Sequence, residues 1–378
     1  MVLNYRYRDT LCATIQLDSD TKSVSIKNFA EDVFYRPFGV IRNPSFKDFE
    51  ELLEERCFPR TNHHAKYYLK QLGLDFYDPL DIVRKTNGKV YGDKFWIEFV
   101  GNCTLQSLHN NVSVTGNQAK FYDSVTDGWY KADYLGYEGL SEYVVSDLLK
   151  HSMILNPNLQ FVLYDICSFK IGNKQLIGCY SKNFIKETEA DLTLFRFFKM
   201  YYGIDITMKM LGMSSKKQIK YVVDSVESVT RLSNFGAFLT LLLELDAFVL
   251  NDDRHFKNIS IIKYDNGGFG LAPIFDNAGS LLSDEYTYSG SNLERLIEVV
   301  ESKPFSCNFD EQLDAAEELY GVQIKFPNSV RFLEEIKPKI LKYYNIEQFK
   351  RVEYVLRHSI RKYSYLAKNP YEELKQRK

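Results

Sequence analysis

Eight residues of this sequence bring together several groups that could do chemistry. The segment 251–258 reads NDDRHFKN and directly follows an apolar run, FGAFLTLLLELDAFVL. Asp253 precedes Asn258 by five residues, and a second acid, Asp276, ends the run LAPIFD. Carboxylate and amide oxygens are hard ligands that suit Mg²⁺ or Mn²⁺. The pattern is typical of phosphoryl transfer, in which one acid accepts the proton of a hydroxyl while an Asn and a second acid hold the metal.

The residues between Asn258 and Asp276 predict a β-hairpin that brings these two side chains together. Two β-like runs, ISIIKY and FGLAPIF, flank the turn sequence DNGG at 265–268. If residue 265 pairs with residue 268, antiparallel pairing places Asn258 opposite Phe275, with Asp276 one position beyond. Asp253 then reaches the same point from the preceding loop. We therefore expect the three oxygen-bearing side chains to converge on one divalent cation.

Phosphoryl transfer also needs a cation on the phosphates, and Lys131 is the best candidate. It lies in the middle of a predicted strand, DGWYKADYLG, and a predicted helix, LSEYVVSDLL, follows. Glu142 in that helix is its expected partner, since a strand lysine paired with a helix glutamate is the protein-kinase pattern. Glu138, one helical turn earlier, is an alternative partner. A plain surface lysine of an alternating strand is the alternative for Lys131 itself.

Other candidate residues have plainer alternatives beside their functional interpretation. Asp252, Asp253 and Arg254 would form a solvated cluster, worth little to stability, if the segment were an ordinary surface loop. His255 is assigned to the site as a brace that fixes the loop backbone, in preference to a proton shuttle. The backbone of Cys179-Tyr180, where the two predicted lobes meet, is a candidate contact for a nucleotide base, and a buried strand end is the alternative.

The periodicity of the chain predicts an α+β protein in three parts. Residues 1–114 read as a separate α+β module, with a strand pair at 10–28 and helices that start after Ser45 and Asp78. Residues 115–184 read as a β-rich lobe with one helix. Residues 185–378 are mainly helical and end in helices with a basic bias.

The composition excludes several classes of protein. Lys and Arg number 48 against 50 Asp and Glu, so the chain lacks the general positive charge of a dedicated nucleic-acid or membrane-surface binder. No run approaches the ~18 apolar residues of a membrane span, and the first residues lack the apolar core of a signal peptide. The six cysteines show no zinc-ligand spacing and are expected to stay reduced. We therefore expect a cytoplasmic protein without direct nucleic-acid or membrane binding.

The motifs resemble those of the HipA-like family of bacterial serine/threonine kinases, which includes the toxin kinase HipA and the compact kinase CtkA. NDDRHFKNIS is similar to the family's catalytic loop, Asn-x-Asp-x-His-x-x-Asn, and LAPIFD is similar to its metal segment, Ala-Pro-x-x-Asp. The resemblance covers roughly residues 116–340. It implies a two-lobed protein-kinase-like fold, with a β-rich N-lobe and a helical C-lobe, preceded by the additional N-terminal module.

The same resemblance implies an activity and a role for each site residue. The chain would transfer the γ-phosphoryl group of ATP, with Mg²⁺ or Mn²⁺, to a Ser or Thr of a protein. Asp253 would be the catalytic aspartate, Asn258 and Asp276 the metal ligands, Lys131 the ATP lysine and Glu142 its partner. The family's regulation adds two further expectations: an antitoxin partner that controls growth inhibition, and autophosphorylation in the turn before the ATP lysine, at Ser124 or Thr126.

Two other functions remain open from the sequence. Small-molecule kinases of the aminoglycoside-phosphotransferase type also use an Asp, a downstream Asn and a second Asp. They usually place a His before the catalytic Asp, whereas His255 follows Asp253 here. A non-catalytic nucleotide-binding module of a toxin–antitoxin system is the other alternative, and the intact Asp253, Asn258 and Asp276 argue against it.

Overall fold

A computed structural model of the chain forms two compact units. It describes residues 1–18, 20–62, 65–90, 92–100, 119–171 and 174–368. The first unit comprises Met1–Ser124 and Ile185–Leu211, and the second comprises Val125–Phe184 and Gly212–Lys378. The division into compact units rests on contacts between residues and assigns no function to either unit. The domain boundaries expected from the sequence therefore stay predictions. The expected boundary at residue 114 lies outside the described residues.

The first unit contains an antiparallel sheet with the strand order β3-β2-β1-β4. Its strands are β1 (Val2–Tyr7), β2 (Thr10–Asp18), β3 (Ser23–Lys27) and β4 (Phe95–Phe99). The predicted pairing of β2 with β3 is confirmed, with Ile15 opposite Ile26. β1 was not predicted, although it pairs with both β2 and β4. Its alternation of buried Leu3, Tyr5 and Tyr7 with partly exposed residues is the period-2 signal of a strand.

Helices of the first unit begin where capping residues predict them. They and the remaining short elements are η1 (Val33–Tyr35), α1 (Phe46–Glu54), α2 (Ala65–Leu72), α3 (Pro79–Thr86), β5 (Lys120–Asp123), β10 (Glu189–Thr193), α5 (Leu194–Tyr202) and α6 (Ile206–Lys209). At the start of α1, Ser45 and Asp48 form the expected capping box: the Ser45 hydroxyl accepts from the Asp48 N–H, and the Asp48 carboxylate accepts from the Ser45 N–H. Asp78 caps α3 in the same position.

The segment Ile185–Leu211 groups with the first unit because its side chains and backbone bind there. Lys199 of α5 contacts the Glu51 and Glu55 carboxylates of α1, at 2.7 and 2.8 Å. The Met200 carbonyl accepts from the Val40 N–H at 2.9 Å. Sequence analysis placed these residues in the helical lobe because their periodicity is helical. Helical periodicity does not show which part of a protein a helix packs against.

The β-rich part of the second unit places β9 (Lys174–Lys182) between β6 (Gly128–Ala132) and β8 (Tyr164–Ile171), antiparallel to both. Helix α4 (Glu138–His151) contacts β8 and β9 and is buried over nearly its whole length. Its buried residues include the polar Ser141, Glu142 and Ser146 as well as apolar ones. Short strands complete the unit: β7 (Met153–Ile154), β11 (Ser260–Tyr264), β12 (Phe269–Leu271) and β13 (Ile324–Lys325).

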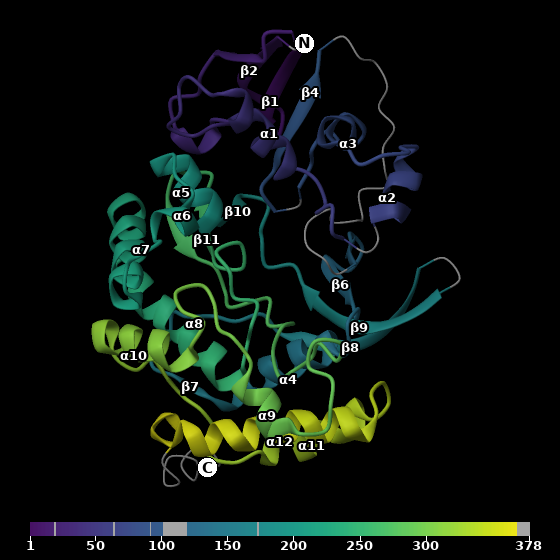
Figure 1. Ribbon diagram of the computed structural model, residues 1–378, viewed down its shortest axis with the longest axis vertical. Coiled ribbons are helices and arrows are strands. Elements are labelled where there is room, and N and C mark those ends of the chain that lie inside the picture. Colours follow the sequence, from purple (N-terminus) through teal and green to yellow (C-terminus); the bar gives the residue numbers. More distant parts are fainter. Residues whose placement is uncertain (19, 63–64, 91, 101–118, 172–173, 369–378) are drawn as a thin grey trace. The chain divides into compact units, whose positions relative to one another are not determined.

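The helical part of the second unit is built around α8 (Phe235–Val249), the apolar run seen in the sequence. α8 contacts α7, α10 and α12 (Figure 1). The helices are α7 (Ser215–Thr230), α9 (Leu293–Glu298), α10 (Phe309–Tyr320), α11 (Arg331–Ile340) and α12 (Ile346–Lys362), followed by η2 (Ser364–Leu366). α8 ends at Leu250, which adopts a left-handed backbone with φ +56°. The chain therefore turns sharply where NDDRHFKN begins. No helix in the described ranges has both the length and the apolar character needed to cross a membrane.

Candidate functional site

The hairpin between the two motifs forms, but its register differs from the expected one by a residue. β11 and β12 pair Ile261 with Leu271 and Lys263 with Phe269. The Tyr264 N–H donates to the Gly268 carbonyl (3.0 Å), so the loop spans three residues. Gly267 ends that loop with φ +88°, which glycine adopts at little cost. The prediction that Asn258 lies opposite Phe275 is therefore wrong, because a two-residue loop was assumed.

Arg254 joins the two motif segments instead. Its Nη1 donates to the carbonyls of Asn258 (3.2 Å) and Phe275 (2.9 Å), and its Nη2 donates to Asn277 Oδ1 (2.7 Å). Its Nε contacts the Asp246 carboxylate of α8 at 2.9 Å, and both of these side chains are fully buried. The surface-cluster alternative is wrong for Arg254. One guanidinium fixes the catalytic-loop motif, the metal-segment motif and the central helix to each other.

Asp246 and Asn251 support that guanidinium. Asn251 Nδ2 donates to Asp246 Oδ1 at 2.9 Å. Burial raises the pKa of Asp246, and the charge of Arg254 acts in the opposite direction. A buried ion pair of this kind tolerates the loss of neither partner, since the remaining charge would be left without compensation. Sequence analysis missed Asp246, although an acid inside so apolar a run was a visible signal.

Asp253 and Asn258 are held by hydrogen bonds of the Asp253 backbone and of the Asn258 amide nitrogen. Asn258 Nδ2 donates to the Asp253 carbonyl (2.9 Å), and the Asp253 N–H donates to Asn251 Oδ1 (3.1 Å). The Asp253 side chain is 53% exposed. Because the Asn258 nitrogen is already bonded, its amide oxygen is the atom left to bind a cation. Asp253 thus presents its carboxylate to solvent from a fixed loop.

His255 contributes to this loop mainly through its backbone. Its carbonyl accepts from the Asn258 N–H at 2.8 Å, and its own N–H donates to the Asp253 carbonyl at 2.9 Å. The ring Nε2 lies 3.9 Å from Asp253 Oδ1, and the ring Nδ1 is buried without a hydrogen-bond partner in the described part of the chain. His255 therefore helps to fix the loop, as expected, but it does so through its backbone hydrogen bonds and not through its ring.

Lys131 forms the predicted contact with Glu142 and a second contact with Asp276. Its Nζ lies 2.5 Å from Glu142 Oε1 and 2.8 Å from Asp276 Oδ1. We call these three residues the Lys131 cluster. Lys131 is almost fully buried and Glu142 entirely so, which excludes the surface-lysine alternative. The structure therefore brings the strand lysine, the helix glutamate and the second acid together.

Glu138 does not compete for Lys131. Its carboxylate accepts from the backbone N–H groups of Tyr134, Leu135 and Gly136, at 3.1, 2.6 and 3.2 Å. It therefore closes the turn between β6 and α4, a structural role. Of the two glutamates that the sequence left open, the structure assigns Glu142 to the lysine.

Electrostatics keep Lys131 charged. Burial alone would lower its pKa, but the carboxylates of Asp276 and Glu142 outweigh burial and raise the pKa well above its ordinary value. Neighbouring groups hold the cluster in place: the Asn277 N–H donates to Glu142 Oε2 (2.9 Å), and the Tyr164 hydroxyl lies 3.4 Å from Lys131 Nζ. The site thus offers a permanent ammonium beside a carboxylate.

Unusual backbone conformations gather around these residues. Asp276 has φ +60°, Leu250 has φ +56°, and Leu281 and Leu282 have φ +59° and +58°. Non-glycine residues rarely adopt this left-handed region, and each instance costs roughly 1–3 kcal/mol that the surrounding structure must offset. Such strain is common at functional sites. It flanks both motifs here.

Cys179 and Tyr180 lie in the middle strand, β9. Cys179 is buried and in register with both Lys131 of β6 and Ile166 of β8, and the Tyr180 ring packs on Tyr130 at 5.0 Å between centroids. Cys179 also belongs to a small apolar cluster beside Lys131. The members and neighbours of this apolar cluster are Val162, Tyr164, Cys179, Phe184 and Phe275. Val162, Tyr164 and Cys179 are buried, and Phe184 and Phe275, which pack against them, are partly buried.

Ser124 and Thr126 lie in an exposed turn between β5 and β6, before the strand that carries Lys131. Both side chains are exposed, as a phosphorylation site must be. Their phosphorylation stays a prediction.

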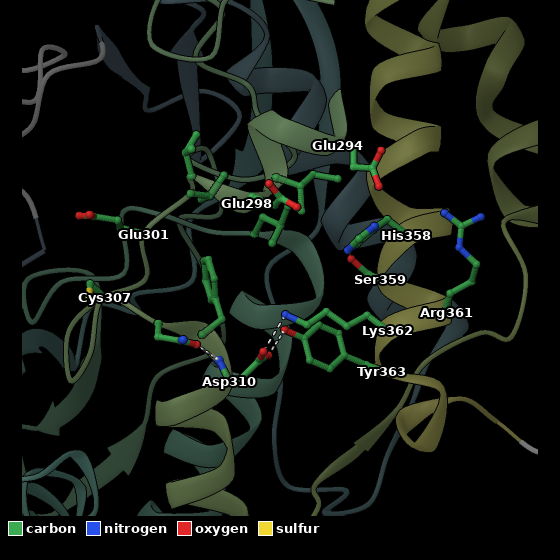
Figure 2. Close-up of a pocket in the computed structure, with 16 residues that line it drawn as sticks. Glu294, Glu298, Glu301, Cys307, Asp310, His358, Ser359, Arg361, Lys362 and Tyr363 are labelled. Atoms are coloured by element: carbon green, nitrogen blue, oxygen red, sulfur yellow. Dashed lines mark hydrogen bonds and ion pairs between the residues drawn. The ribbon is translucent and has the colours of Figure 1, made fainter. Parts of the chain in front are cut away.

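A pocket of about 910 Å³ in the second unit lies apart from these residues. Figure 2 shows it between α9, the first turn of α10 and α12, with Lys362 and Tyr363 contacting Asp310. None of the predicted site residues lines it. Its lining residues are Leu250, Glu294, Ile297, Glu298, Val299, Val300, Glu301, Cys307, Asn308, Phe309, Asp310, His358, Ser359, Arg361, Lys362 and Tyr363.

Comparison with known proteins identifies the fold. No protein-family model matches the sequence, and no curated protein matches it significantly. A solved structure of the Shewanella oneidensis MR-1 toxin–antitoxin complex of HipA, HipB and operator DNA matches 96% of this chain and 97% of its own, with 12% identity and a TM-score of 0.55. The Helicobacter pylori proinflammatory kinase CtkA matches 65% of this chain and 90% of its own, with 16% identity and a TM-score of 0.44. The chain has the α+β, protein-kinase-like fold of HipA.

Proposed function

We propose that the chain is a protein serine/threonine kinase of the HipA-like family that uses ATP and Mg²⁺ or Mn²⁺. The observation that carries the proposal is the Lys131 cluster, in which one lysine contacts both the helix glutamate Glu142 and the second motif acid Asp276. A lysine and glutamate in this arrangement, with an acid that can take a metal, are the parts that phosphoryl transfer requires. The fold shared with HipA supports the same conclusion.

Each residue has a defined task in this reaction. Asp253 accepts the proton of the acceptor hydroxyl as that oxygen attacks the γ-phosphorus. Lys131, kept cationic by its two carboxylates, binds the phosphates of the nucleotide. Arg254 holds the catalytic and metal segments at a constant separation, because it bonds the backbone of both. Reaction rates depend strongly on such positioning.

Asn258 and Asp276 are suited to Mg²⁺ or Mn²⁺ rather than to zinc. The described residues include no group of three or more His, Cys, Asp or Glu able to hold a metal by themselves. A pair of one amide and one carboxylate instead suits Mg²⁺, which keeps several waters and takes phosphate oxygens as ligands. The bound metal would neutralise charge on the phosphates.

The apolar cluster at Val162, Tyr164 and Cys179 is suited to the adenine base. Phe184 and Phe275 pack against it with ring centroids 5.2 Å apart, and Tyr164 also approaches Lys131. Aromatic and aliphatic side chains next to a phosphate-binding cation are what a nucleotide needs. In this proposal Cys179 contributes as a buried apolar side chain, because β9 pairs with both β6 and β8 at Cys179 and Tyr180.

A regulated role in the cytoplasm is also part of the proposal. The HipA chain with the same fold occurs in a complex with HipB and operator DNA. We infer that this chain likewise has an antitoxin partner, inhibits growth by phosphorylating a protein, and is itself modified at Ser124 or Thr126. The near balance of acids and bases supports partner binding through protein rather than direct nucleic-acid contact.

Mass spectrometry after incubation with ATP and Mg²⁺, with and without candidate acceptor proteins, tests the activity. We expect phosphate on Ser or Thr, and a loss of at least about a thousandfold in Asp253→Ala. Asp224→Ala is the matched control, because Asp224 is equally exposed and pairs with a lysine, Lys220. Full transfer by Asp253→Ala would refute the assignment. Phosphate on a sugar or antibiotic, with none on protein, would favour the small-molecule alternative, and tight nucleotide binding without transfer would favour the non-catalytic one.

A further inference from the structure

A second lysine lies at the exposed face of Asp253. Lys303 Nζ is 3.5 Å from Asp253 Oδ1, although the two residues are 50 positions apart in the sequence. We infer that Lys303 is a catalytic residue that contacts the γ-phosphoryl group as it passes to the acceptor hydroxyl. The inference rests on the proposed kinase function and adds to it a residue that no motif identified.

The loop that carries Lys303 is held in one conformation. Within the loop, the Ser302 N–H donates to the Cys307 carbonyl (3.0 Å) and the Ser302 hydroxyl donates to the Ser306 carbonyl (2.7 Å). Gln312 of α10 is fully buried and binds the backbone at the lysine and two residues after it. Its Nε2 donates to the Lys303 carbonyl (3.2 Å), and its Oε1 accepts from the Phe305 N–H (3.3 Å). The position of the Lys303 Cα is therefore fixed.

The same loop is packed against the catalytic-loop motif. The ring of Phe305 meets the ring of Phe256 edge-on, with centroids 5.6 Å apart, and Phe256 lies three residues after Asp253. The Ser215 hydroxyl at the start of α7 donates to Glu311 at 2.7 Å and lies 3.3 Å from the Phe305 carbonyl. Glu301 and Cys307, on either side of this loop in the sequence, line the pocket drawn in Figure 2. The loop therefore directs Lys303 to Asp253 and other side chains to the pocket.

Folding stability does not explain this arrangement. The side chains of Lys303 and Asp253 are 50% and 53% exposed. An ion pair so open to water contributes at most ~1 kcal/mol. A buried glutamine, an aromatic contact and a closed loop are thus used to place a weakly stabilising ammonium beside the proposed proton acceptor.

The other strong cations of the site are already committed. Lys131 is paired with Glu142 and Asp276, and Arg254 is paired with Asp246. In the transfer, the acceptor oxygen bonds to the γ-phosphorus, the bond from that phosphorus to the ADP oxygen breaks, and the hydroxyl proton goes to Asp253. Negative charge is spread over the γ-phosphoryl oxygens at the moment they pass Asp253. An ammonium at this point stabilises that charge without itself changing its protonation.

Lys303→Met in the full chain tests the inference, with two readouts. We expect kcat for phosphoryl transfer to fall about a hundredfold, and the preference for ATP over ADP, measured by calorimetric binding with Mg²⁺, to fall about fivefold, because only ATP carries the γ-phosphate. Lys303→Arg keeps the charge and should stay within about tenfold of the unmodified chain. A merely structural role would not change the ATP-to-ADP preference.

Lys216→Met is the matched control. Lys216 also forms a half-exposed ion pair, with Glu318, and is paired with no site residue in the described part of the chain. Identical kcat and identical ATP-to-ADP preference in Lys303→Met and Lys216→Met would overturn the inference. If the unmodified chain transfers no phosphate, the kinase proposal fails, and the ATP-to-ADP preference alone then decides whether Lys303 contacts the γ-phosphate. A chain that binds no nucleotide would overturn both.

Discussion

Each unit buries a cluster of opposite charges, and the two clusters differ in which charge is in excess. In the first unit a single carboxylate, Asp93, contacts two guanidinium groups, those of Arg56 and Arg196. We call these three residues the Arg56 cluster. In the second unit, the Lys131 cluster has one ammonium between two carboxylates. The first cluster therefore has a surplus cation, and the second has a surplus anion.

The surroundings of the clusters differ as well. The surplus charge of the Arg56 cluster is met by neutral acceptors: the Tyr5 hydroxyl accepts from both arginines, at 3.2 and 3.0 Å, and Arg56 also donates to backbone carbonyls. In the Lys131 cluster both carboxylates contact the lysine, and the backbone of Asp276 is held at φ +60°. A buried charge cluster alone does not identify a site. A carboxylate that is paired with a buried lysine and lies on a strained backbone beside the two motifs does so much better.

Replacing the central acid of each cluster should give opposite results, and this is the largest effect we expect. Asp276→Asn removes the surplus anion, so folding should persist while phosphoryl transfer falls about a thousandfold. Asp93→Asn leaves two buried guanidinium groups without a carboxylate and should lower the free energy of unfolding by about 3–5 kcal/mol. Urea unfolding and a transfer assay on each variant measure both quantities.

The comparison fails if the two variants exchange behaviours. Strong destabilisation by Asp276→Asn together with normal transfer would make the Lys131 cluster structural. Loss of transfer per folded molecule in Asp93→Asn would give the Arg56 cluster a function that its satisfied hydrogen bonds do not suggest.

The two glutamates of α4 provide a second, smaller test within one helix. Glu142→Gln removes one of the carboxylates that position Lys131, and we expect kcat/KM for ATP to fall by about ten- to a hundredfold. Glu138→Gln removes an acceptor oxygen from the turn before α4 and should cost about 1–3 kcal/mol of stability. Its transfer rate per folded molecule should be unchanged. Equal transfer rates in the two variants would contradict this expectation and would mean that Lys131 does not need Glu142 for its function.

The local parts of the site were predictable from the sequence. The alternation of a strand followed by a helix predicted the contact between Lys131 and Glu142, which is present, whereas the roles inferred for Asp253, Asn258 and Asp276 from side-chain type and spacing stay predictions. These features depend on residues close in sequence or on a single strand and helix. They need only period-2 and period-3.6 patterns to be recognised.

The parts that depend on tertiary contacts were not predictable. The bridging role of Arg254 was not predicted, because the acid that pairs with it, Asp246, lies inside an apolar helix. Lys303 reaches Asp253 from a loop 50 residues away that has no motif. The hairpin register depended on whether Gly267 adopts positive φ, which the sequence DNGG permits but does not require. Because a two-residue loop was assumed in place of the three-residue loop, the predicted strand register was wrong by one residue.

A last, smaller effect concerns Glu244, a buried acid without an arginine partner two residues from Asp246 in α8. The Gln323 N–H donates to both of its carboxylate oxygens, at 2.8 and 3.1 Å. Burial raises the pKa of Glu244 from 4.5 to about 9, and the Gln323 N–H opposes that rise. Between those two pH values the folded chain keeps a proton that the unfolded chain releases, so the free energy of unfolding should fall as pH rises.

Glu244→Gln resembles the protonated form and cannot titrate. Between about pH 5 and 8 its free energy of unfolding should therefore decline less steeply than that of the unmodified chain, by about 1 kcal/mol per pH unit. Urea unfolding at several pH values measures the slope, with the exposed Glu334→Gln as the control. Parallel slopes in the unmodified chain and Glu244→Gln would mean that Glu244 is already ionised in the folded chain. Backbone hydrogen bonds would then be enough to stabilise a buried, ionised carboxylate in this chain. The argument that Asp276 needs a cation beside it would be weaker.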